Sequence, residues 1–142
     1  MYKKMQVSSN FKDIKQAATA IAGLFKEAKA DEADIFDIRL SLEEALINAA
    51  KYGNKLDEKR NVYIEIDIAG NKATISVEDE GDGFDHESLP DPTKEENLLK
   101  ASGRGVFLIK HLMDKVEYNK KGNRVTITKY LKKSQTRQQI AE

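Results

Sequence analysis

Two polar side chains, Glu44 and Asn48, stand four residues apart in the stretch LSLEEALINAAKYGN, residues 40–54. In an α-helix, residues at this spacing project from one ridge, so the carboxylate and the amide lie side by side. Such a carboxylate can accept a proton or orient a nucleophile, and the amide oxygen can complete the coordination of a hard ion such as Mg²⁺. An exposed pair on a helix surface has the same spacing, so this pair alone leaves both interpretations open.

A second candidate site lies in VEDEGDGF, residues 77–84, directly after an expected strand. Asp79 ends the strand and can accept a hydrogen bond from the exocyclic amine of a base. Gly81 and Gly83 allow a sharp turn and a close approach of backbone to a ligand. An acidic hairpin turn is the alternative. A calcium loop of the EF-hand type is disfavoured, because its spacing requires Asp or Asn where Gly81 stands.

The third candidate is SGRGVFLIKHL, residues 102–112, in which Gly103 and Gly105 flank Arg104 ahead of an apolar helix. Helix N-terminal amides attract phosphate, and Arg104 with nearby Lys100 adds positive charge. The alternative is a flexible loop that leads into a core helix, which would have the same sequence features. Neither the Walker spacing nor GxGxxG occurs here, which excludes a P-loop or a Rossmann site on motif grounds.

Composition narrows the class of protein. The chain has 142 residues, of which 39% are hydrophobic and 34% charged, as expected for one soluble domain. Lys plus Arg and Asp plus Glu number 24 each, so net charge gives no argument for direct binding of nucleic acid or a membrane. The lack of cysteine excludes disulfides and thiolate chemistry, and no apolar run reaches signal-peptide or membrane-spanning length. We therefore expect a cytoplasmic protein.

Two helices are expected in the first part of the chain, and the second carries the first motif. Ser9 or Asn10 can cap the first helix. The second runs from Asp31 or Asp34 to Tyr52, and Gly53 is a plausible stop. The two apolar stripes at helical spacing are Phe11, Ile14, Ala18, Ile21, Phe25 and Ala28 in the first helix, and Ile35, Ile38, Leu42, Ala45 and Ala49 in the second.

After the two helices, apolar and polar residues alternate with a period of two, which is typical of strands. A short strand around residues 5–7 is followed, after the helices, by an antiparallel hairpin over residues 62–77 and a second over 116–127, with a helix over 105–115 between them. These elements predict an α+β protein. The expected architecture is a two-layer sandwich, with a mixed, mostly antiparallel sheet covered by helices on one face. We expect residues 1–133 to form one domain and 134–142 a polar C-terminal tail.

The order of the three motifs resembles the N, G1 and G2 boxes of the GHKL ATPases, which share the Bergerat ATP-binding fold. Within that superfamily the chain looks most like the anti-sigma-factor serine kinases of bacterial partner-switching systems, and the resemblance covers about residues 9–131. The resemblance implies ATP and Mg²⁺ as cofactors. Glu44 would be the general base, Asn48 the Mg²⁺ ligand and Asp79 the acceptor for the adenine amino group. Residues 85–102 would form the ATP lid. The other implied nucleotide-binding residues are Lys51, Gly81, Gly83, Lys100, Ser102, Gly103, Arg104, Gly105 and Val106.

The same resemblance implies a function and partners. The protein would phosphorylate a serine of a STAS-domain antagonist, sequester a sigma factor and form a homodimer. The alternative is a non-catalytic ATP-binding module that regulates another target by binding. Two departures bear on this choice: Asn123 and Arg124 stand where the family has two threonines, and Ala101 replaces an arginine that often precedes the third motif.

Overall fold

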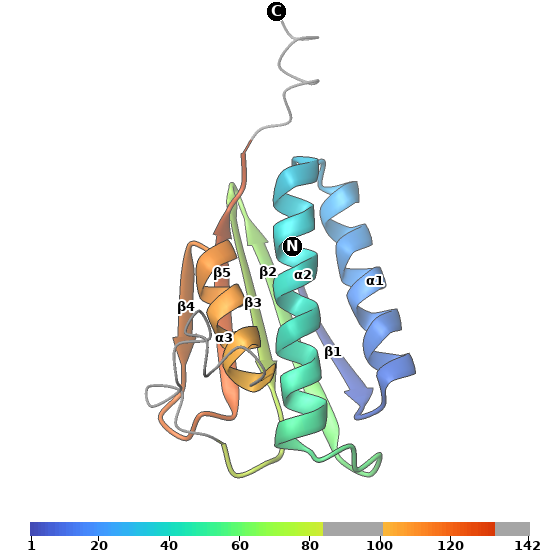
Figure 1. Ribbon diagram of the computed structural model, residues 1–142. Helices are drawn as coiled ribbons and strands as arrows, with labels where there is room; N and C mark the ends of the chain where they lie inside the picture. The colour runs from blue at the N-terminus through green and yellow to red at the C-terminus, as the bar shows by residue number, and fades with distance from the viewer. Residues whose placement is uncertain (84–100, 133–142) are drawn as a thin grey trace, which may run out of the picture.

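The computed structural model describes residues 1–83 and 101–132, which form two layers (Figure 1). One layer is a five-stranded sheet in the order β1-β2-β3-β5-β4, and every pair of neighbours in it is antiparallel. The helices cover one face of this sheet. The expected α+β sandwich is confirmed, with an antiparallel sheet in place of a mixed one. The elements in chain order are β1 (Tyr2–Ser8), α1 (Phe11–Glu27), α2 (Glu32–Ile47), η1 (Asn48–Gly53), β2 (Asn61–Ala69), β3 (Lys72–Glu78), α3 (Ala101–Leu112), β4 (Lys115–Tyr118) and β5 (Arg124–Tyr130).

Both expected hairpins form, and both are antiparallel. In the first, Ile64 of β2 pairs with Val77 of β3, and Ile66 pairs with Ile75. These side chains are almost completely buried, whereas Tyr63, directly before Ile64, is 38% exposed. The alternation arises because successive residues of a strand point to opposite faces and only one face of this sheet is covered by helices.

The core lies between that covered face and the helices. Phe25 and Ile21 of α1, Leu42 and Leu46 of α2, and Ile109 of α3 all have less than 2% of their surface exposed. Helix α2 lies between α1 and α3 (Figure 1). It therefore buries residues on more than one side, including Leu46, which lies outside the single stripe expected from the sequence.

In helix α1, two residues of the expected apolar stripe are exposed and not buried. Phe11 is the first residue of the helix and remains 52% exposed, because the helix meets the sheet only one turn later, at Ile14. Ala28 is the C-cap and is also exposed. Asn10 is the N-cap, since its side chain accepts a hydrogen bond from the Asp13 N–H at 2.8 Å. Ser9 instead donates its hydroxyl to the Arg60 carbonyl.

Helix α3 begins earlier than expected. The sequence placed its start at Gly105, but it runs from Ala101, so Gly103 and Gly105 both lie inside the helix. In residues 1–83 and 101–132, no helix has both the length and the apolar character needed to cross a membrane.

Removal of the Asn10 cap tests the start of α1. We expect Asn10→Ala to lower the free energy of unfolding by about 1 kcal/mol, because the Asp13 N–H loses its acceptor. Asn10→Ser retains a side-chain oxygen at the cap and should recover most of this loss. Urea denaturation of the three proteins measures the difference, and equal stability of wild type and Asn10→Ala would show that the cap contributes nothing.

Candidate nucleotide site

The first motif lies where α2 changes its helical form. Glu44 is in the last turn of α2, and Asn48 begins η1, a π-helical segment that continues the same helix to Gly53. The wider turn is closed by a hydrogen bond from the Asn54 N–H to the Ala49 carbonyl at 2.8 Å. Such π-helical turns are rare and are frequent at functional sites. Here the wider turn forms the C-terminal part of the first motif, ahead of β2.

Gly105 brings the third motif to the first. A Cβ atom on Gly105 would lie 2.9 Å from Glu44 Oε2 and 3.2 Å from Asn48 Nδ2. The hydrogen of a glycine is therefore what permits α3 to approach α2 this closely. The Asn48 amide oxygen lies further from this point, at 3.6 Å, so the nitrogen is the end that faces Gly105. The expected grouping of Glu44, Asn48 and Gly105 is thus present.

Asp79 lies at the C-terminal end of η1, beside Gly53 and Gly81. A Cβ on Gly53 would overlap the Asp79 carboxylate, and one on Gly81 would overlap the Gly53 carbonyl. The Gly81 N–H donates to Asp79 Oδ1 at 2.8 Å, which holds one carboxylate oxygen in place. The glycines therefore let the end of η1, the Asp79 carboxylate and the following loop pack against each other.

The surroundings of Asp79 change its acidity. Burial raises the pKa of its carboxyl above the ordinary value, and the negative charge of Glu78 acts in the same direction. The hydrogen bond from Gly81 and the positive charges of Lys121 and Arg60 oppose the shift. The net effect is a raised pKa, so an ionised Asp79 is less stable here than it would be in water.

A pocket of about 190 Å³ lies between the end of α2, η1, α3 and strands β3 to β5. Apolar side chains form much of its wall, while Asn48 and Asp79 supply polar groups. Tyr118 is also part of the wall, and burial raises the pKa of its hydroxyl to about 12, so it stays protonated at neutral pH. A largely apolar cavity with a few polar groups is typical of sites for small organic ligands. The lining residues are Ala45, Asn48, Ala49, Tyr52, Gly53, Val77, Asp79, Gly83, Val106, Ile109, Tyr118, Gly122, Asn123, Arg124 and Val125.

The remaining residues expected at the site fall into three groups. Gly83 and Val106 line the pocket, and Gly83 has a positive φ of 82° and lies against the Lys121 carbonyl. Lys51 is exposed, and its ammonium group lies 5.4 Å from the centre of the neighbouring Tyr52 ring instead of lining the pocket.

The last group belongs to the third motif. The structure describes Ser102, Gly103 and Arg104 only as backbone, in the first turn of α3. Lys100 and most of the expected lid, residues 85–102, lie outside the described residues.

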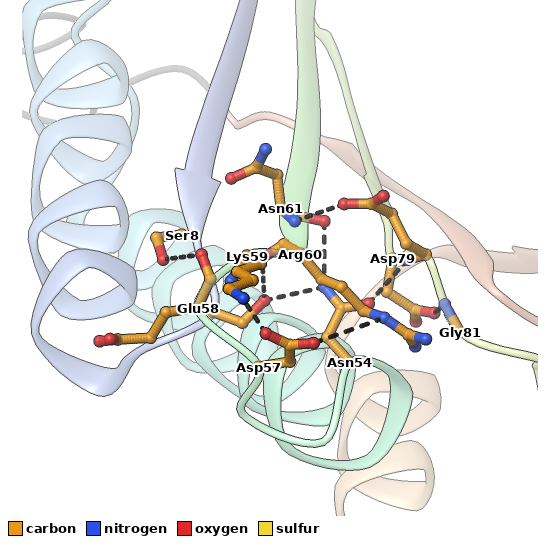
Figure 2. A network of polar contacts seen from close by, with 11 residues as sticks. Ser8, Asn54, Asp57, Glu58, Lys59, Arg60, Asn61, Asp79 and Gly81 are labelled. Atoms are coloured by element: carbon orange, nitrogen blue, oxygen red, sulfur yellow. Dashed lines mark hydrogen bonds and ion pairs between the residues drawn. The ribbon is translucent and has the colours of Figure 1, made fainter.

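Sequence reasoning missed a set of asparagines that hold the loop around Asp79. Asn54 is fully buried, and its amide oxygen accepts from the Glu80 N–H at 2.7 Å. Its amide nitrogen donates to Ser9 Oγ and to the Asn61 carbonyl. Figure 2 shows Asn54 beside Asn61 and Asp79 at this end of the sheet. The only signal in the sequence was an asparagine directly after Gly53, which does not indicate its distant partners.

Comparison with known proteins links this geometry to a family. The sequence matches the histidine kinase-like ATPase domain over residues 7–129. Serine-protein kinase RsbW of Staphylococcus aureus strain bovine RF122 / ET3-1 is 35% identical over 144 aligned positions, which cover 94% of this chain and 89% of that protein. The protein of the same name from strain MRSA252 has the same identity and coverage.

A solved structure shares the fold. It contains the RsbU and RsbW domains of Rv1364c from Mycobacterium tuberculosis, and the superposition has a TM-score of 0.63 with 18% identity. The match covers 92% of this chain and 32% of that longer one. At this identity the likeness supports the fold alone.

The raised pKa of Asp79 predicts how its replacement changes stability with pH. Because the folded-state pKa lies above the ordinary value of 3.8, the folded protein holds more protons than the unfolded chain between the two values. The contribution of Asp79 to stability therefore falls as pH rises through this window. Asp79→Asn keeps an oxygen for the Gly81 N–H and removes the buried charge. We expect this variant to match or exceed the free energy of unfolding of the wild type at neutral pH, with the difference shrinking in acid.

Urea denaturation of both proteins at neutral and acid pH tests this expectation. A stability advantage that grows as the pH falls would contradict the raised pKa.

Proposed function

Because this chain belongs to the histidine kinase-like ATPase family, we propose that it is an ATP-dependent serine-protein kinase, the activity carried in the name of its Staphylococcus aureus relatives. The single observation that carries this proposal is the approach of Gly105 to Glu44 and Asn48, next to the pocket that Asp79 lines. The Asn48 amide and the Asp79 carboxylate line the pocket, and the Glu44 carboxylate lies near Asn48 at Gly105. Phosphoryl transfer from a nucleotide can use groups of these kinds. The resemblance inferred from the three motifs is confirmed by the family match.

The pocket supports adenine as the bound base. Its apolar wall, which includes Val77 and Ile109, offers contacts to a flat ring. Asp79 Oδ1 already accepts the Gly81 N–H. Among the hydrogen bonds of the described residues, Oδ2 takes part in none, so it is the oxygen available to the exocyclic amine. In this proposal Gly81 and Gly83 shape the loop beside the base.

The donors present fit Mg²⁺ that arrives with the nucleotide. The described residues contain no group of three or more His, Cys, Asp or Glu side chains able to hold a metal ion by themselves. Mg²⁺ is commonly held by one or two protein oxygens together with substrate phosphates, so the single amide oxygen of Asn48 suits it. The ion would neutralise phosphate charge when bound.

Phosphate binding is proposed for the start of α3. The N–H groups in the first turn of a helix have no partner within the helix, and the helix dipole favours negative charge there. In α3 this turn contains Ser102 and Gly103. We assign additional positive charge to Arg104, Lys100 and, from η1, Lys51.

Glu44 is the proposed general base. In the transfer, the hydroxyl oxygen of an acceptor serine attacks the γ-phosphorus, the bond to the ADP oxygen breaks, and Glu44 takes the hydroxyl proton. The neighbouring Glu43 has a different environment, since it accepts a hydrogen bond from Arg39 Nε at 3.1 Å. The two adjacent acids are therefore expected to differ in function.

The proposed acceptor is a serine of a STAS-domain antagonist, and the proposed second partner is a sigma factor that the kinase sequesters in the cytoplasm. A phosphate on the antagonist would weaken its binding by placing negative charge at the interface. A homodimer is the proposed assembly, with residues 1–133 as the kinase domain and 134–142 as the tail. The non-catalytic module is not favoured, because the relatives are named as kinases and Glu44 lies beside Asn48 and Gly105.

The pair Glu44 and Glu43 provides a matched test of the base. We expect Glu44→Ala to slow phosphate transfer by about a hundredfold or more while ATP still binds, because it removes only the proton acceptor. Glu43→Ala should retain transfer. The measurement is incorporation of label from radiolabelled ATP into the STAS-domain protein, with ATP affinity determined in parallel. Transfer by Glu44→Ala at the wild-type rate would exclude Glu44 as the base.

Asn48→Ala tests the proposed magnesium ligand. The affinity for ATP should rise with Mg²⁺ in the wild type, and this rise should be largely lost in the variant because the amide oxygen is missing. Isothermal titration calorimetry with and without Mg²⁺ gives both affinities. A magnesium effect of unchanged size in the variant would remove Asn48 from the metal site.

A further inference from the structure

The peptide unit between Asp79 and Glu80 is held by an asparagine side chain at each end. The Asn123 amide nitrogen donates to the Asp79 carbonyl at 2.9 Å. On the other side of the same peptide unit, the Glu80 N–H donates to the Asn54 amide oxygen at 2.7 Å. A peptide unit is planar, so a hydrogen bond at its carbonyl and another at its N–H together define its orientation.

The peptide unit before Asp79 is held as well. The Asp79 N–H donates to the main-chain carbonyl of Asn123 at 2.9 Å. Both peptide units that flank the Asp79 Cα are therefore bound, and Gly81 holds one carboxylate oxygen. Since the two flanking planes set φ and ψ, the direction in which the Asp79 side chain leaves the backbone is determined by these contacts.

Each asparagine is itself oriented by further hydrogen bonds. Asn119 donates its amide nitrogen to the Asn123 amide oxygen at 2.7 Å, which directs the Asn123 nitrogen toward Asp79. The Asn119 amide oxygen accepts the N–H groups of Gly122 and Asn123 in the turn between β4 and β5.

On the helix side, Asn54 has no exposed surface, and its nitrogen donates to Ser9 Oγ at 2.8 Å and to the Asn61 carbonyl at 3.0 Å. A buried amide with its donors and acceptor satisfied has little freedom to turn. The chain thus supplies one rigid amide from the end of η1 and one from the turn before β5.

We propose that Asn54 and Asn123 are positioning residues for base recognition, which clamp the Asp79–Glu80 peptide so that the Asp79 carboxylate meets the exocyclic amine of the nucleotide. This inference rests on the proposed function. The two residues that it adds act on the ligand through the Asp79–Glu80 peptide, because their amide groups are bound to that peptide. Removal of either amide frees one end of the peptide unit, and the carboxylate then spends less time in the orientation that the amine requires.

The consequence is a loss of selectivity for the amine and not a general loss of binding. ATP contains the exocyclic amine, whereas purine riboside triphosphate has hydrogen in its place and the same triphosphate. The ratio of the two affinities therefore reports the contact with Asp79. A net hydrogen-bond contribution of about 0.5–1.5 kcal/mol corresponds to a change of about twofold to tenfold in this ratio.

The experiment measures the affinities of both nucleotides for the full chain, without an acceptor protein, in Asn123→Ala, Asn54→Ala and Asn71→Ala. Asn71 is the matched control, because it is exposed in the turn between β2 and β3. We expect the ratio of ATP affinity to purine riboside triphosphate affinity to fall by about twofold to tenfold in the first two variants, and to stay constant in the control. In an Asp79→Ala background, Asn123→Ala should leave the ratio unchanged.

Thermal unfolding of each variant separates positioning from stability. Asn54→Ala loses the three hydrogen bonds of a buried side chain and can destabilise the fold, so the half-buried Asn123 provides the second variant. A weaker affinity for both nucleotides with an unchanged ratio would overturn the clamp and leave the proposed kinase function intact. Failure of the wild type to bind either nucleotide would overturn the proposed function and this inference with it.

Discussion

Close packing of backbone at glycines is the constraint on which the site depends. Gly105 lets α3 lie against the ends of Glu44 and Asn48, and Gly53 leaves room for the Asp79 carboxylate. A side chain at either position would need the space that a functional group now occupies. The three motifs thus form one site because two of the contacts between them are made by residues without side chains.

Polar contacts hold the loop around Asp79. Asn54, Asn119 and Asn123 donate and accept hydrogen bonds with main-chain groups of this loop and of the turn before β5. Buried polar groups are costly when unpaired, so a satisfied network of this kind favours one arrangement of the loop over others. The same network explains how a loop rich in glycine and acidic residues can present a carboxylate in a defined direction.

The Asp79 carboxylate is partly buried, and burial makes its ionised form less favourable. Burial beside η1 raises the pKa of its carboxyl, so the ionised form is disfavoured in the free protein. In the proposed function, a hydrogen bond donated by the amine of a bound base would offset part of this penalty. The arrangement is consistent with a general feature of binding sites, in which groups needed for a ligand lower the stability of the unbound fold.

The sequence by itself determined the elements and the order of the motifs. Period-two alternation located both hairpins, Asn10 was among the expected caps, and the three motifs predicted the family. These features are local, since burial of one helix or strand face leaves a repeating pattern in the chain. Only the tertiary structure decided that Gly105 lies inside α3 against Glu44, and that Asn54 and Asn123 meet at one peptide unit. Such contacts join residues far apart along the chain, and the distance between them depends on how the helices and the sheet pack, which no local pattern records.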